Sequence, residues 1–399
     1  MPVRLGPAEE SLIAQLQNAG AVDAAERLRV SGLPTRKVEH YHYTDLKTLL
    51  RQVPDTAGIA TETSAPAIRI PGSYRVMLVN GVLEGAGKAP AGTIVGKIDG
   101  SPLTTRDDVI VRLNQALVTE SLSIELNASV DPVVHVDHRI EGVAGHLADG
   151  VRVYLGEGGS ATLVETFSGS NEAHLGNHGT YIAVGAGATL THIQIDLSGK
   201  NVRHFATTEY ELAENANLRT LTIHAGADLA RSQIYARFSG QGSHADLTGL
   251  NLTDDGQHKD ITLHISHAVP NTTSTESYKQ IARGRSKAVF QGKIVVERDA
   301  QKTDAKLNMQ GLMLSDEAEI LSKPELEIFA DDVVCGHGST CGDLDADSLF
   351  YLMSRGIARK QATSMLVRGL IAELFDPVAD EELREVLLAV SDGWLEQGD

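Results

Sequence analysis

Short segments that alternate apolar and polar residues fill the middle of this 399-residue chain. Between about residues 70 and 334 they include VRVYLGEG, ATLVETFSG and ATLTHIQIDLSG, and Gly, Asn or Asp interrupts them. Such alternation with frequent turn residues is typical of β-strands. Similar triplets begin at Ala161, Ala188, Ala216 and Ala245, separated by 27, 28 and 29 residues. A near-constant period of strands and turns predicts a β-solenoid, whose stacked coils share one core.

The alternative to a solenoid is a β-sandwich whose sequence resembles itself by accident at these four places. A solenoid leaves its end strands exposed, and proteins usually cover such edges. We therefore expect the helical segments at the two ends of the chain to cover the ends of the solenoid.

The N-terminal region has a helical rather than a strand pattern. Residues 8–31 carry apolar side chains spaced for one helix face, and Gly32 ends the pattern. A shorter helix is expected from Tyr43 to Val53, with Thr44 as its N-cap. One further helix, from Asp107 to Val118, is expected to interrupt the strands.

The helical period returns at Asp345, which is placed to cap a helix that stops at Gly356. Two more helices are expected over ARKQATSMLVRGLIAELF and EELREVLLAVSDGWL. The sequence thus predicts an N-terminal helical domain (1–66), a β-solenoid core (67–342) and a C-terminal helical domain (343–399).

The charge and the cysteine content exclude several classes of protein. The formal net charge is −18, and no basic patch is visible, so we expect no nucleic-acid partner. No apolar run approaches the roughly 20 residues that span a bilayer, so we expect no membrane association. The two cysteines cannot form a disulfide framework, and no signal-peptide pattern is visible. A cytoplasmic location is therefore expected.

Histidine is frequent: 13 of the 15 histidines lie between His135 and His337. His135 and His138 are three residues apart, as are His264 and His267, so each pair points to opposite faces of a strand. Neither pair is therefore a natural metal site. We expect these histidines to face solvent or to make ordinary hydrogen bonds.

The segment Cys335-Gly-His337-Gly-Ser-Thr-Cys341-Gly lies where the strand pattern ends. Cys335 and His337 project to the same side of an extended segment. A thiolate and an imidazole suit iron or zinc, and they also suit a nucleophile and its base. A structural zinc site needs four ligands, so a site completed by a second chain is more plausible than a closed one. The alternative is a buried cysteine beside a histidine that stabilises a turn.

Longer motifs resemble a known family. The segments are Pro-Asn-Thr at 270–272, VFQGKI at 289–294, QKTDA at 301–305, LMLSDEA at 312–318 and KPELEIFADDVVCGHG at 323–338. Together with LFYLMSRGIARKQATSMLVRGLIAELF they are similar to the SufB/SufD family of iron–sulfur cluster assembly proteins. GLPTRKVEHYHYTDLKTL (32–49) resembles the N-terminal segment of the SufD branch, with Tyr41 where the family usually has Trp.

The resemblance implies a right-handed parallel β-helix core between terminal helical domains. It also implies pairing with a SufB-like chain, with a nascent Fe–S cluster built at the interface. His337 matches an interface histidine that is a candidate iron ligand, and Cys335 matches its neighbouring cysteine. No role is carried over to Cys341. A SufC-type ATPase is expected to dock on the C-terminal helices, around Tyr351, Ser354, Arg355 and Gly356.

On this view the chain is a non-catalytic subunit without an intrinsic cofactor. The resemblance also allows a homodimer of the isolated chain and a reduced flavin bound by the complex. Two other classes stay open. A stand-alone metal-dependent hydrolase needs three clustered ligands and an open position, which these spacings do not show. A β-helix carbohydrate-active enzyme needs aromatic side chains for stacking, and the chain has one Trp.

Overall fold

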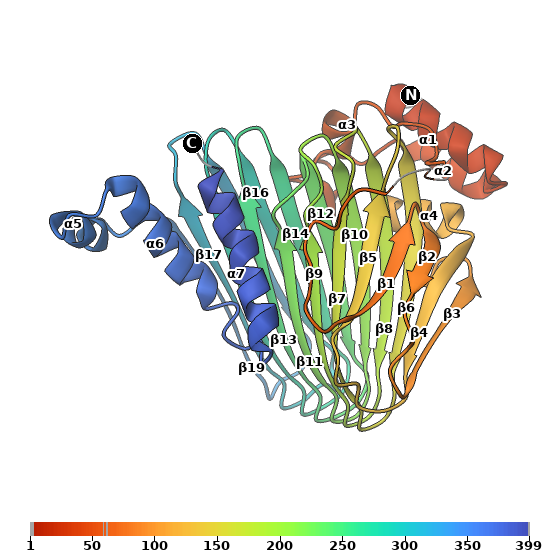
Figure 1. Cartoon of the computed structure of the whole chain (residues 1–399). Helices are drawn as coiled ribbons and strands as arrows, with labels where there is room; N and C mark the ends of the chain where they lie inside the picture. Colours follow the sequence, from red (N-terminus) through yellow and green to blue (C-terminus); the bar gives the residue numbers. More distant parts are fainter. Residues whose placement is uncertain (1–3, 59, 61–62, 398–399) are drawn as a thin grey trace.

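A flattened parallel β-solenoid forms most of this structure, a computed structural model that describes residues 4–58, 60 and 63–397. The predicted 1–66 and 343–399 domains therefore include residues outside the described ones (1–3, 59, 61–62 and 398–399). Each coil contributes one strand to each of two sheets, and Figure 1 shows these sheets facing one another. The fold class predicted from the repeat is thus confirmed, and the sandwich alternative is wrong.

One sheet has ten strands, in the spatial order β19 (Val334–Gly342), β17 (Asp304–Met313), β15 (Thr273–Ala282), β13 (His244–Thr253), β11 (Asn217–His224), β9 (Thr189–Asp196), β7 (Ser160–Gly169), β5 (Val134–Ile140), β1 (Tyr74–Val79) and β2 (Val82–Ala86). The other has nine, in the order β18 (Glu319–Ile328), β16 (Lys287–Val296), β14 (His258–His267), β12 (Leu229–Phe238), β10 (Arg203–Leu212), β8 (Leu175–Val184), β6 (His146–Leu155), β4 (Glu120–Leu126) and β3 (Thr93–Asp99).

The coils stack in a register that differs slightly from the one read in the sequence. Ser160 pairs with Thr189, Thr189 with Asn217, and Asn217 with His244, so the steps are 29, 28 and 27 residues. Ala161 accordingly faces Leu190 instead of Ala188. The sequence alignment slipped by two residues at this step. Because side chains alternate with period two, the slip kept the same face and left the solenoid pattern visible.

The interior of the solenoid has an apolar half and a polar half. Leu163, Leu190, Leu218 and Leu247 belong to the apolar core cluster, beside the turns that lead from the nine-stranded to the ten-stranded sheet. The same strand faces carry buried polar side chains at the opposite turns: His138, Asp149, Glu165, His178, His192, Asp196, His204, His224, Asn251 and Lys259. Buried polar groups need partners, so this half restricts the register more strongly than the apolar half.

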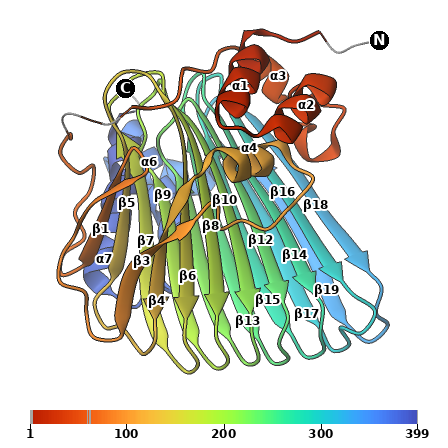
Figure 2. The same cartoon turned by 90° about the vertical axis from the view of Figure 1, so that its right-hand side faces the viewer.

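The two ends of the solenoid differ. At one end β2 pairs antiparallel with β1, and β3 pairs antiparallel with β4. At the other end β18 pairs only with β16 and β19 only with β17, among the described strands. The expectation that terminal helices cover both ends is therefore wrong. Figure 2 shows β18 and β19 at the free end of the row of coils.

The N-terminal helices are α1 (Pro7–Asn18), α2 (Val22–Ser31), a 3-10 turn η1 (Glu39–Tyr41) and α3 (Leu46–Leu49). The predicted helical face over 8–31 is two helices, because Gly20 between them has φ +75°. The helix expected from Tyr43 to Val53 is only the short α3. Its N-cap is Asp45, which accepts a hydrogen bond from the Thr48 amide at 2.9 Å.

A buried polar group attaches the N-terminal domain to the outer face of the nine-stranded sheet. Thr44 points inward instead of capping a helix and bonds to His258 at 2.9 Å and to Asp260. Arg231 pairs with Asp260, and both side chains are fully buried. Arg231 also lies over the Tyr41 ring at 4.4 Å and donates to the His40 carbonyl at 2.9 Å. The segment 40–44 is therefore a structural anchor.

The helix α4 (Val109–Leu117) confirms the expected interruption and packs between the N-terminal helices and this sheet. The Tyr41 hydroxyl donates to Asp108, its N-cap, at 2.7 Å. The C-terminal helices are α5 (Ala346–Ser354), α6 (Arg359–Ala372) and α7 (Glu381–Glu396). α6 and α7 bury apolar residues against outward-facing side chains of the ten-stranded sheet, as Figure 1 shows for α7.

Glu276 is an isolated carboxyl group inside the solenoid. It is fully buried, and neither oxygen has a hydrogen-bond partner. The Ser274 hydroxyl, which partly opposes the shift, is bonded to His267 at 3.1 Å. Burial raises the pKa of Glu276 to about 8. The group is therefore largely protonated in the folded chain at neutral pH.

Replacement of Arg231 should show how much the anchor contributes. Arg231→Met leaves the Asp260 carboxylate buried without its cation, and we expect a loss of about 3–5 kcal/mol in the free energy of unfolding. Arg237→Met, on the same strand, removes an exposed pair with Glu297 and should cost less than about 1 kcal/mol. Urea unfolding of both variants measures the difference. Equal losses would contradict the assignment of Arg231 as the anchor.

Glu276 predicts a pH dependence of stability. Between its ordinary pKa and about 8, the folded chain holds a proton that the unfolded chain releases. Stability contributed by this site therefore falls as pH rises, by at most about 1.4 kcal/mol per unit. Glu276→Gln should remove this slope and be more stable than wild type at pH 8, by roughly 4–5 kcal/mol at most. The exposed Glu297→Gln is the control. Parallel pH profiles for Glu276→Gln and wild type would show that Glu276 is charged in the fold.

Candidate functional site

The last coil carries the predicted Cys335 and His337 on an unpaired strand. In β19 they lie beside Ala305 and Leu307 of β17. Cys335 is partly buried against the apolar core of the solenoid, whereas His337 is exposed. Both belong to the inward-facing set of the strand, so both lie at the open mouth of the interior. The structure therefore keeps the two side chains on one face, as the i,i+2 spacing predicts.

The chemistry of Cys335 does not suit an activated nucleophile. Burial raises the pKa of its thiol, and the charges of Asp304 and Glu276 add to this effect. A thiol with a raised pKa carries less of the reactive thiolate at neutral pH. A metal or a positive partner group at the open face would lower that pKa again. The reading of Cys335 and His337 as a nucleophile and base within this chain therefore loses its support.

Cys341 does not join the Cys335 site. It lies six residues further along the same strand, which is roughly 20 Å at the usual rise. It pairs with Gly311, where an added Cβ would lie 2.8 Å from its sulfur. Cys335 and His337 thus supply two ligands, fewer than a closed site needs.

Apolar side chains surround the open end, and the sequence reading missed them. Phe329, just after β18, is 62% exposed, and Val334, which begins β19, is 64% exposed. Ile328 is also exposed. Pro324 lies within β18, and proline is tolerated in a strand mainly at a sheet edge. Free backbone groups and exposed apolar side chains at one edge are typical of a surface that another strand covers.

The second predicted surface lies on α5. Tyr351 is 60% exposed, and the neighbouring Phe350 is 73% exposed. The Arg355 guanidinium lies 5.9 Å from the Tyr351 ring centre, and Ser354 donates to the Tyr351 carbonyl at 2.7 Å. Gly356, with φ +87°, ends the turn. The four predicted residues therefore form one continuous end of the helix.

A hollow of about 670 Å³ lies beside this helix end. Phe350, Met353 and Leu349 line one side of it, and residues 313–316 after β17 line the other. Figure 1 shows α5 projecting away from the solenoid. An exposed aromatic and methionine surface beside an arginine has the composition that protein interfaces favour.

Most of the histidines are neither scattered nor exposed. Ten of them are buried: His135, His138, His146, His174, His178, His192, His204, His224, His258 and His267. Hydrogen bonding is confirmed for many, for example His135 with Thr166 at 2.8 Å. The expectation that they face solvent is wrong. The strand parity of His138 and His178 was the signal in the sequence, but it does not show which coils bring the two together.

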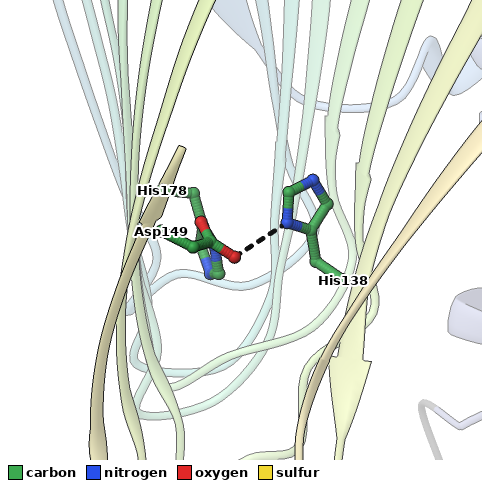
Figure 3. A group of neighbouring side chains, drawn as sticks. All are labelled: His138, Asp149 and His178. Carbon is green, nitrogen blue, oxygen red and sulfur yellow. Dashed lines mark hydrogen bonds and ion pairs between the residues drawn. The ribbon is translucent and has the colours of Figure 1, made fainter. Parts of the chain in front are cut away.

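One group of three ligand-bearing side chains does occur among the described residues: His138, Asp149 and His178 (Figure 3). The absence of such a cluster, inferred from sequence spacings, is therefore wrong. Burial alone would lower the pKa of His138, but the charge of Asp149 and hydrogen bonds to Asp149 and Glu165 raise it to about 10. The same contacts outweigh burial at both carboxyl groups and hold the pKa of each well below its ordinary value. The group is closed off from solvent, unlike the open end.

No helix of the described chain is long and apolar enough to cross a bilayer. Comparison with known proteins gives a clear match. The SUF system FeS cluster assembly SufBD core domain matches residues 138–370, from the first buried histidine of the group to α6.

Three relatives extend this match. The iron-sulfur cluster assembly protein SufD of Escherichia coli (strain K12) is 30% identical over 381 residues, 91% of this chain and 90% of that protein. The SufBD family protein ML0594 of Mycobacterium leprae (strain TN) is 34% identical over 62% of this chain and 63% of its own length. The chloroplastic protein ABCI7 of Arabidopsis thaliana is 30% identical over 59% of this chain and 50% of its own length. The chain therefore belongs to the SufB/SufD family of iron–sulfur cluster assembly proteins.

Proposed function

We propose that this chain is a SufD-type, non-catalytic scaffold subunit that pairs with a SufB-like chain through β18 and β19. The observation that carries the proposal is the open end of the solenoid, where Cys335 and His337 offer two ligands beside free strand edges. In this proposal a nascent Fe–S cluster is cargo held between the two chains. The subunit has no resident cofactor.

The edge explains why a partner chain is favoured over solvent. Strand addition would satisfy the outer backbone groups of β19 and bury Phe329 and Val334. It would also bring further ligands to Cys335 and His337, because a partner strand passes directly beside them. A second copy of this chain could cover the same edge. The homodimer is therefore the competitor that the SufB-like chain must displace.

The α5 end is proposed as the docking surface of a SufC-type ATPase. Tyr351 and Phe350 provide exposed aromatic area, and Arg355 provides a charge that is free to meet an acidic partner group. Since α5 projects from the solenoid, a nucleotide-dependent motion of the ATPase would pull on α6 and α7. These helices pack on the ten-stranded sheet. We place the assembly in the cytoplasm, where two unpaired cysteines stay reduced.

Other functions lack a suitable site. A metal hydrolase needs a coordination position that substrate can reach, but His138, Asp149 and His178 are all at most 3% exposed. A carbohydrate enzyme needs a row of exposed aromatic rings, but the single tryptophan, Trp394, is 5% exposed beneath Arg283. Neither alternative is favoured by an observation of this structure.

The role of His337 can be separated from assembly of the complex. His337→Ala removes the exposed imidazole at the open end, so reconstituted complex should form cluster at least tenfold more slowly. Its elution volume with SufB-like and SufC-type partners should be unchanged. Ser339→Ala, two residues along the same face of β19, is the matched control. Loss of assembly in His337→Ala would make the histidine structural, and normal cluster formation would remove it from the ligand set.

The docking surface is tested by reversing one charge. Arg355→Glu should weaken binding of a SufC-type ATPase at least tenfold, equivalent to about 1.4 kcal/mol, and leave the SufB-like pairing intact. Arg384→Glu on α7, away from Tyr351, serves as the control. Titration calorimetry with each purified partner gives both affinities. An unchanged affinity for the ATPase would refute the assignment of this helix end.

A further inference from the structure

A buried group of imidazoles and carboxylates spans the interior of the solenoid at the end opposite β19. His138 comes from β5 in one sheet, and Asp149 and His178 come from β6 and β8 in the other. The Asp149 carboxylate lies 3.0 Å from His138 Nδ1 and 2.7 Å from His178 Nδ1. Figure 3 shows Asp149 between the two rings. One potential ligand atom from each residue lies within 4.8 Å of the others.

A second layer of contacts orients this group. His138 bonds through Nε2 to Glu165 Oε2 at 3.0 Å, and Glu165 bonds to His192 at 2.9 Å. A carboxylate on the far nitrogen of a histidine is the usual support of a metal-binding imidazole. Gly176 provides space for the second ring, because a Cβ there would lie 2.5 Å from His178 Nε2. The surroundings thus resemble those of a bound ion more than those of an isolated ion pair.

We propose that His138, Asp149 and His178 form a structural site for one divalent transition-metal ion, which joins the two sheets inside the solenoid. Two nitrogen ligands and one oxygen ligand favour Zn²⁺ or Fe²⁺ over Mg²⁺ or Ca²⁺. Tetrahedral zinc separates neighbouring ligand atoms by roughly 3.3 Å. Small adjustments of these side chains therefore close the site. A fourth position is left for water or another group of the polar interior.

The charge of the ion matches the surroundings. The Asp149 and Glu165 carboxylates together balance a divalent ion when both imidazoles are neutral and His138 donates its Nε2 proton to Glu165. Isolated charges are costly in such a dry interior, whereas a neutral set is tolerated. The full burial of the ligands means that the ion enters while the chain folds. It also means that the ion leaves slowly.

This site is independent of the proposed partners. It lies on β5, β6 and β8, whereas Cys335 and His337 lie on β19 at the other end of the row of coils. Its ligands contain no sulfur. Metal binding by the isolated chain can therefore be tested without any SufB-like or SufC-type protein, and failure of one proposal leaves the other intact.

The test uses the full chain expressed in medium that contains zinc, and a parallel culture that contains cobalt. After brief dialysis against a chelator, elemental analysis should find ~1 zinc per chain. The cobalt form should show visible absorption of a nitrogen and oxygen coordinated ion. Asp149→Asn should retain at least tenfold less of either metal. His135→Gln, on the same strand as His138 but facing outward, is the matched control and should retain metal as wild type does.

A spectroscopic measurement on the unaltered protein protects the test against misfolded variants. X-ray absorption at the zinc edge should show two imidazoles and oxygen, without sulfur. Wild-type protein that retains less than roughly a tenth of an equivalent, equal retention by Asp149→Asn, or sulfur in the ligand shell would each overturn the proposal. If Asp149→Asn does not fold, His178→Gln replaces it, and the absorption spectrum of wild type decides.

Discussion

Each coil of this protein relies on the next coil for its backbone hydrogen bonds, and the last coil has no neighbour in the described chain. At one end of the solenoid the antiparallel pairs β1–β2 and β3–β4 change the direction of the outermost strands. At the other end β18 and β19 keep free parallel edges. Unpaired edges promote unwanted association unless a partner covers them. The candidate cluster ligands lie on that edge, so assembly and chemistry depend on the same strand.

The solenoid interior combines two kinds of stabilisation. Its apolar half needs only residues of the right size and parity, which explains how a register can drift by two residues without loss of the core. Its polar half needs each histidine to meet a particular carboxylate or hydroxyl group. The chain from His178 through Asp149, His138 and Glu165 to His192 crosses between the sheets. Such networks specify one arrangement of coils where apolar packing alone would allow several.

Much of the fold was predictable because strand periodicity and repeat length are local features of the sequence. The positions of Cys335 and His337 on one face followed from their spacing. The closeness of His138, Asp149 and His178 did not, because it depends on which coils are adjacent and on the exact lengths of turns. Thr44 was misread as a helix cap, since no local pattern reveals that its hydroxyl group meets His258 and Asp260. Long-range contacts of this kind are set by the tertiary structure.

Hydrogen exchange of the backbone amides tests the central claim most directly. The chain alone and the chain mixed with a SufB-like partner would be compared by mass spectrometry of matched peptides. The account predicts that the partner slows exchange in β18 and β19 (319–328 and 334–342), while exchange in β2 and β3 at the other end is unchanged. Protection confined to β2 and β3, or unchanged exchange in β19 within a stable complex, would contradict it.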